Sequence, residues 1–162
     1  MHLALLAAAM AMALAVRLAC SGGALWLDEA WSAVFARDSG TALGVLLRVN
    51  HDNNHHLNTL WLQWVGADAP VRVQRALSVV CGTALVWLAA TIAGRRSPLA
   101  GVLAAWMFAL SPILVAYGSE ARGYAPMLLA YGVAVWAVDG WLERRGRAVP
   151  ARPLAWAAGF AM

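Results

Sequence analysis

The segment ALSVVCGTALVWLAATIAG, residues 76 to 94, decides the fold, because it carries no charged side chain and is long enough to cross a membrane. A helix rises about 1.5 Å per residue, and the hydrocarbon core of a bilayer is about 30 Å thick. Similar runs lie at about 3 to 20, 99 to 116 and 125 to 142, and a fifth begins at Leu154. These runs predict an all-α, multi-pass transmembrane protein, with residues 1 to 162 forming the N-terminal part of a longer membrane domain.

The composition agrees with this class of protein. Apolar residues make up 62% of the chain and charged residues only 12%, which is unlike a soluble domain. The net charge of +4 comes from arginines clustered in the predicted loops. A nucleic-acid-binding protein spreads basic residues over one solvated face among aromatic residues, so the sequence predicts contact with membrane lipids and none with nucleic acid.

The arginines also predict the orientation, since short cytoplasmic loops are enriched in basic residues. Arg95 and Arg96 separate the second and third runs, and four more arginines lie between 144 and 152. These loops should be cytoplasmic, which places the loop 21–75 on the extracytoplasmic side of the plasma membrane. The first run could instead be a cleaved signal peptide. However, no Lys or Arg precedes it, and Arg17 falls where a lipoprotein cleavage site has an apolar residue, which favours a retained span.

The outer loop 21–75 is too long for a simple connection, and it contains two amphipathic helical patterns. The first runs from Glu29 to Arg37. The second begins at Leu57 and repeats apolar residues through Val65, which is typical of a helix that lies along the membrane surface.

A polar stretch, Asn50 to His56, precedes the second pattern. His51 and His55 are spaced i, i+4, and Asp52 and His56 are close in sequence, so a helix could gather them around a divalent metal. The alternative is an N-cap region in which an Asn side chain accepts backbone N–H groups and the stretch contacts a polar substrate. A divalent metal is therefore a possible cofactor, and the sequence establishes none.

Two acidic motifs follow the first and third runs, on the same predicted side of the membrane. They are Trp26-Leu27-Asp28-Glu29 and Ser119-Glu120-Ala121-Arg122. A carboxylate at the end of a membrane span is costly to desolvate, so it usually lies in a polar cavity with a function or a partner. This placement predicts a catalytic site on the extracytoplasmic side.

Four motifs in order resemble the N-terminal half of the family 39 type glycosyltransferases. These belong to the GT-C superfamily, which includes the protein O-mannosyltransferases and the aminoarabinose transferase of lipid A. The motifs are Trp26-Leu27-Asp28-Glu29-Ala30, the Asp-Asn-Asn-His run 52–55, the segment 75–82 that opens the second run, and Ser111-Pro112 followed by Tyr117-Gly-Ser-Glu120-Ala-Arg122-Gly-Tyr124.

The resemblance implies an enzyme that moves a sugar from a polyprenyl-phosphate donor to a lipid, glycan or protein acceptor. It places the family's acidic residue on Asp28, with Glu29 beside it, and inverting transfer needs a carboxylate as general base. The lipid phosphate leaves as an anion, so cations are needed and a general acid is not. The residues expected to contact substrates are Asp52, His55, Arg75, Glu120, Arg122 and Tyr124.

Other interpretations of these residues stay open from sequence. Arg75 could extend toward the interface, and Arg122 could pair with Glu120, because Arg suits both phosphate and carboxylate. A transporter or channel subunit would use Asp28, Glu29 and Glu120 as an outer cation or proton site. A third interpretation is a small metal-binding or scaffolding membrane protein, and this interpretation depends on the histidines.

Overall fold

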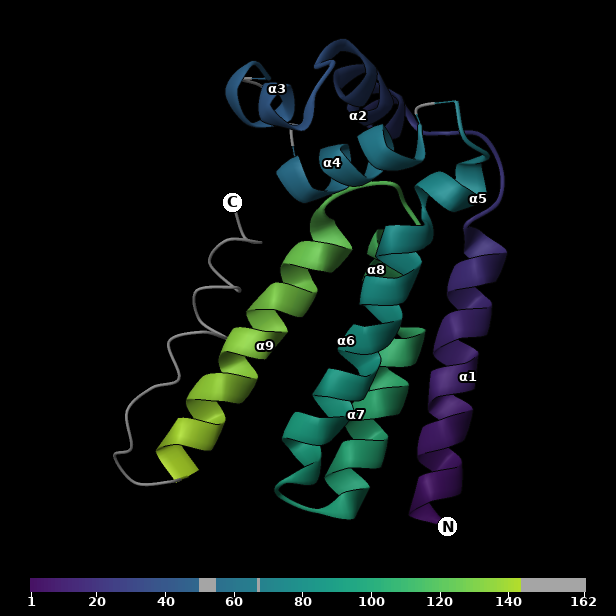
Figure 1. The fold of residues 1–162 in the computed structure, drawn as a ribbon. Coiled ribbons are helices and arrows are strands. Elements are labelled where there is room, and N and C mark those ends of the chain that lie inside the picture. The colour runs from purple at the N-terminus through teal and green to yellow at the C-terminus, as the bar shows by residue number, and fades with distance from the viewer. Residues whose placement is uncertain (50–54, 67, 144–162) are drawn as a thin grey trace.

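The computed structural model describes residues 1–49, 55–66 and 68–143 (Figure 1). Within these ranges the chain is helical and contains no strand. In the described part of the chain, three helices are long and apolar enough to span a membrane. They are α1 (His2–Cys20), α6 (Ala76–Gly94) and α9 (Tyr124–Glu143), and they match the predicted runs 3–20, 76–94 and 125–142 to within two residues.

The remaining predicted span, 99–116, folds as two shorter helices. Helix α7 (Pro98–Leu110) ends at Ser111, and α8 (Pro112–Tyr117) begins directly after it. Pro112 has no N–H to donate, so the α7 hydrogen-bond ladder cannot continue through it. At the other end of α7, the Ser97 hydroxyl accepts a hydrogen bond from the Ala100 N–H at 3.1 Å and caps the helix.

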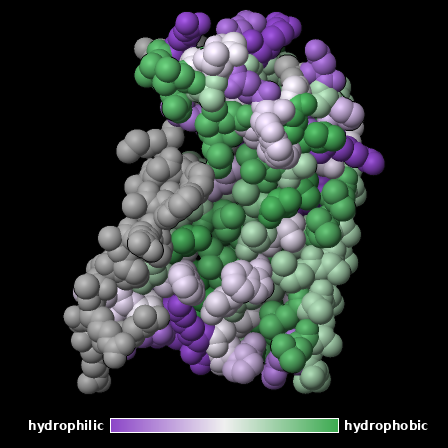
Figure 2. All heavy atoms as spheres, in the orientation of Figure 1, coloured by the Kyte–Doolittle hydropathy of each residue, from purple (hydrophilic) through white to green (hydrophobic). Residues whose placement is uncertain are grey.

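Small residues let the long helices approach closely. Helix α6 contacts α1, α7 and α9, and alanines form most of the buried cluster between α1, α6 and α7. A Cβ added to Gly101 of α7 would lie 2.9 Å from the Ala90 carbonyl oxygen of α6. Hydrophobic residues cover the sides of these helices, and hydrophilic residues gather toward both ends (Figure 2).

The described residues between α1 and α6 form an upper layer of short helices above the long ones (Figure 1). These are α2 (Leu27–Asp38), α3 (Ala42–Leu47), α4 (His56–Val65) and α5 (Val71–Gln74). The two predicted amphipathic helices correspond to α2 and α4, whereas α3 and α5 had no periodic pattern to predict them. The N-cap residue of α4 is His55, not an asparagine.

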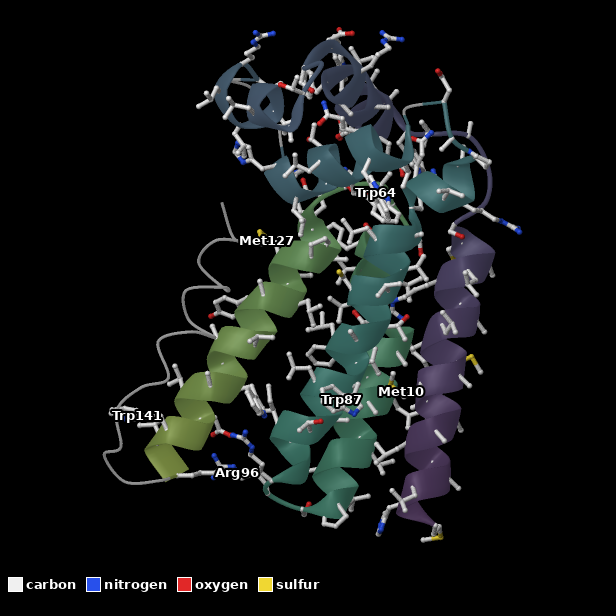
Figure 3. All side chains as sticks on the ribbon, in the orientation of Figure 1. Met10, Trp64, Trp87, Arg96, Met127 and Trp141 are labelled. Atoms are coloured by element: carbon white, nitrogen blue, oxygen red, sulfur yellow. The ribbon has the colours of Figure 1, made fainter. Side chains whose placement is uncertain are left out.

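Helix α4 turns its polar side inward and part of its apolar stripe outward. Asn58, Thr59 and Leu62 are buried, whereas Trp64 is 79% exposed. Trp64 lies level with the upper ends of the long helices (Figure 3), where a Trp at a membrane interface would be expected.

The lower ends of α6 and α9 are joined by ion pairs. Arg95 and Arg96 contact the two carboxylate oxygens of Asp139 at 2.7 and 3.1 Å. Nη1 of Arg95 also lies 4.0 Å from Oε2 of Glu143. These pairs connect the turn after α6 to the last turns of α9.

Candidate functional site

The upper ends of the long helices meet the upper layer at a buried ion pair between Glu29 and Arg75. Their side chains are 0% and 2% exposed. Arg75 donates to both carboxylate oxygens of Glu29, at 2.8 Å from Nε and 2.6 Å from Nη2. Its other donors reach the carbonyl oxygens of Ser21, Gly22 and Ala24. All five N–H donors of the guanidinium thus have acceptors within the protein, which leaves none for a substrate phosphate.

Glu29 is the common acceptor of three segments. It occupies the third position of α2 and accepts the Trp26 N–H at 2.7 Å, as in a capping box. It also accepts the Ala121 N–H at 2.5 Å, from the loop 118–123 between α8 and α9. Burial raises the pKa of Glu29, but the hydrogen bonds from Arg75 and the two backbone N–H groups outweigh it, so the pKa lies below its usual value. Glu29 and Arg75 therefore hold together the segments that form the site.

Asp28, the neighbour of Glu29, faces the loop 118–123 with a different partner. Its Oδ2 lies 3.0 Å from Nη1 of Arg122. The Asp28 side chain is 52% exposed and that of Arg122 is 18% exposed, so the pair lies at the protein surface, where solvent and solutes reach the carboxylate. The alternative pairing of Arg122 with Glu120 is not the one observed.

Aromatic rings continue the site beyond Arg122. The guanidinium lies 4.5 Å from the centroid of the Tyr124 ring, and Nη2 donates to the Tyr124 hydroxyl at 2.9 Å. Tyr117, the last residue of α8, packs on Tyr124 with the ring centroids 4.5 Å apart. The ring of His55 meets Tyr124 edge-on at 5.2 Å.

His55 reaches this position because residue 123 is a glycine. A Cβ added to Gly123 would lie 2.4 Å from Cβ of His55. Burial and then the charges of Arg122 and His56 lower the pKa of His55, so the imidazole is neutral at pH 7 and can accept a proton or bind a metal. The predicted partners His51 and Asp52 lie outside the described residues. Among those that are described, no three His, Cys, Asp or Glu side chains gather as a metal site requires.

Glu120 completes the cluster of charges. Within the described part of the chain its carboxylate has neither a hydrogen bond nor an ion pair, although Arg122 and Arg75 are close enough to favour its charged form. Burial, followed by the negative charge of Glu29, raises its pKa above the usual value. Glu120 is therefore more easily protonated than a solvent-exposed glutamate.

Two polar residues to which the sequence assigned no role hold the loop 118–123. The Asn58 amide donates to the Ala121 carbonyl at 2.8 Å, and the Ser78 hydroxyl donates to the Arg122 carbonyl at 3.1 Å. Both side chains are fully buried. The sequence places Asn58 on the polar face of the predicted helix, and only the structure shows that this face is buried and that its amide needs a hydrogen-bond partner. Tyr117 was quoted in a motif without a role.

A hydrophobic groove of about 470 Å³ lies below this cluster, between α6, α7, α8 and α9. Its lining includes Leu114 and Leu128, which lie about one helical turn from Tyr117 and Tyr124 respectively. The groove thus ends close beneath the tyrosine pair. Its lower part reaches Ile92 and Ala93, far along α6.

The predicted site residues therefore separate into two groups. Asp28, His55, Arg122 and Tyr124 share one partly exposed cluster beside Glu120, and Glu29 with Arg75 forms the buried support beneath it. Comparisons of the chain with protein-family models, with curated proteins and with solved structures find no match.

Proposed function

We propose that this chain belongs to a multi-pass membrane glycosyltransferase that uses a polyprenyl-phosphate sugar as donor. One observation carries the proposal: the partly exposed Asp28–Arg122–Tyr124 cluster lies directly above a hydrophobic groove. A lipid phosphate has a charged head and a long apolar tail, and this arrangement provides complementary surfaces for both.

The donor would bind with its phosphate at Arg122 and its isoprenoid chain in the groove. Arg122 is the cation suited to this role, because every donor of Arg75 already has an acceptor. A guanidinium offers paired N–H groups that match phosphate oxygens. When the phosphate takes these N–H groups from Asp28, the Asp28 carboxylate becomes available to the acceptor. Tyr117 and Tyr124 supply aromatic surface on which a sugar ring can pack.

The reaction would proceed with Asp28 as general base. Asp28 removes the proton from an acceptor hydroxyl as its oxygen attacks the anomeric carbon, and a new C–O bond forms there. The bond between that carbon and the phosphate oxygen breaks, and the lipid phosphate leaves with the electron pair as an anion. Its negative charge is stabilised by Arg122. The proton ends on Asp28, and no oxidant, reductant or further reactant is required.

The transporter interpretation receives less support from the same geometry. An outer cation site needs carboxylates that are open to the ion. Two of the three candidates, Asp28 and Glu29, form ion pairs with arginines, and Glu29 is fully buried. A positive guanidinium next to each carboxylate disfavours a second cation. The orientation of the site toward the extracytoplasmic side is part of this proposal and rests on the basic α6–α7 turn.

The test is sugar transfer in membranes that express the complete gene, with a panel of labelled polyprenyl-phosphate sugars. Asp28→Asn should lower the rate by about 10² to 10⁴ at equal expression. Asp38→Asn is the matched control, because Asp38 lies on the same helix with its side chain 64% exposed, and its rate should stay within about twofold of the parent, since surface substitutions away from a site have small effects.

Two results would count against the proposal. Equal transfer by the parent and Asp28→Asn would exclude Asp28 as the base. If no donor is used, while ion flux through the same membranes depends on Asp28, the protein is a transporter.

A further inference from the structure

Helix α1 contains a fully buried arginine whose partners are all backbone carbonyls. Arg17 is 0% exposed although α1 is one of the helices apolar enough to span a membrane. Nη1 donates to the carbonyl oxygens of Ala13 and Ala109 at 3.1 and 3.5 Å. A charged side chain in such a helix usually has a function, because it is costly to desolvate.

The acceptors of Nη2 lie on both sides of the break between α7 and α8. They are the carbonyl oxygens of Phe108 and Leu114, each at 3.3 Å. In an unbroken helix the Phe108 carbonyl would accept the N–H of residue 112, but Pro112 has none. Backbone groups released by a proline inside a membrane need donors from a neighbouring helix. Arg17 supplies donors to both helices at their junction.

Two glycines make room for the guanidinium. A Cβ added to Gly82 of α6 would lie 2.8 Å from Nε of Arg17, and one added to Gly118 would lie 2.6 Å from the same atom. Any larger residue at either position would displace Arg17 or the backbone around it. Two separate segments of the chain therefore leave a space that only this side chain fills.

The junction leads directly to the candidate site. Helix α8 is six residues long, and its last residue, Tyr117, packs on Tyr124. The Leu114 carbonyl accepts both Arg17 and the Gly118 N–H, the latter at 3.0 Å. A change at Arg17 is thus transmitted through one short helix to the tyrosine pair.

We propose that Arg17 is a positioning residue, which sets the direction of α8 and thereby holds Tyr117 against Tyr124 at the site. The inference concerns the geometry of the site and holds whether or not the protein transfers sugars. Its failure is therefore distinguishable from failure of the proposed function, because the test measures no activity.

The chain contains three tyrosines, Tyr117, Tyr124 and Tyr131, so fluorotyrosine labelling gives three ¹⁹F resonances that Tyr→Phe variants assign. In the 162-residue chain in detergent micelles, Arg17→Met should shift the resonances of Tyr117 and Tyr124. The Tyr131 resonance is the internal comparison, since its side chain is 68% exposed and lies seven residues beyond Tyr124 on α9. Because Tyr131 lines the same groove as Phe108 and Leu114, it should move, but less than the other two. Arg17→Lys keeps three donors and should produce a smaller shift.

A second background tests the link to the helix break. Pro112→Ala restores an N–H that can bond to the Phe108 carbonyl, so Arg17→Met should shift Tyr117 less in that background than in the parent. The proposal is overturned if Arg17→Met leaves Tyr117 and Tyr124 unmoved, if Tyr131 shifts as much as the other two, or if Pro112→Ala does not reduce the effect. Should Arg17→Met fail to fold, Arg17→Lys in the two backgrounds gives the same comparison.

Discussion

Removing the Glu29 carboxylate should destabilise the chain more than any change at an exposed charge. In Glu29→Gln the guanidinium of Arg75 stays buried at 2% exposure without its counter-ion. One oxygen of the carboxylate becomes an NH₂ group, which faces N–H donors on whichever side it lies. Breaking a buried pair by removing one partner costs about 3 to 5 kcal/mol, so we expect a loss of that size in the free energy of unfolding.

The measurement is reversible unfolding of the purified chain in mixed micelles, followed by circular dichroism. Asp38→Asn is the control, because the Arg37–Asp38 pair is exposed on both sides and should contribute no more than about 1 kcal/mol. The variants Glu29→Met and Arg75→Met, alone and combined, complete a double-mutant cycle. The combined loss should be smaller than the sum of the single losses by about 0.5 to 3 kcal/mol. A Glu29→Gln chain within about 1 kcal/mol of the parent would refute the reasoning.

Two further predictions concern pH and a close contact. Because the pKa of Glu29 is lower in the folded chain, its contribution to stability is complete above the unfolded value of about 4.3 and is lost as pH falls through the folded pKa. The free energy of unfolding of the parent should therefore be lower at a pH below 4 than at pH 6. The free energy of unfolding of Glu29→Gln should depend less steeply on pH. Parallel curves for the two proteins would contradict this. Gly123→Ala should displace His55, since the new Cβ would lie 2.4 Å from Cβ of His55, at a cost of about 1 to 3 kcal/mol. If the His55 imidazole NMR signals change but the free energy of unfolding does not fall, His55 moves away from the new Cβ without a cost in stability, and the prediction is wrong.

Local patterns predicted the helices well where the pattern was long. The apolar run 76–94 corresponds to α6 without a change at either end, and the amphipathic repeat from Leu57 predicted α4. The run 99–116 was predicted as one span because hydropathy does not register the missing N–H of Pro112. Helices α3 and α5, of six and four residues, are too short to carry a periodic signal.

The pairing of charges could not be predicted in the same way. Asp28 and Glu29 are adjacent in sequence, yet one meets Arg122 at the surface and the other meets Arg75 in the interior. The difference arises because successive residues of a helix point about 100° apart, and the position of Arg75 depends on how α6 packs. Arg17 was weighed only in a cleavage motif, since its acceptors on α7 and α8 lie more than ninety positions away.

The contacts of Glu29 form in a fixed order during synthesis, because its partners lie at different distances along the chain. Arg75 follows it by 46 positions and Ala121 by 92. Ribosomes add about 5 to 20 residues per second, so roughly 5 to 18 seconds pass between the appearance of Glu29 and that of Ala121. Trp26 precedes Glu29, Arg75 arrives at about half that time, and the loop 118–123 with Arg122 arrives last, followed by Tyr124. A nascent chain therefore contains the Glu29–Arg75 pair before it receives Arg122 and Tyr124, and a chain that ends before residue 122 lacks the Asp28–Arg122 pair.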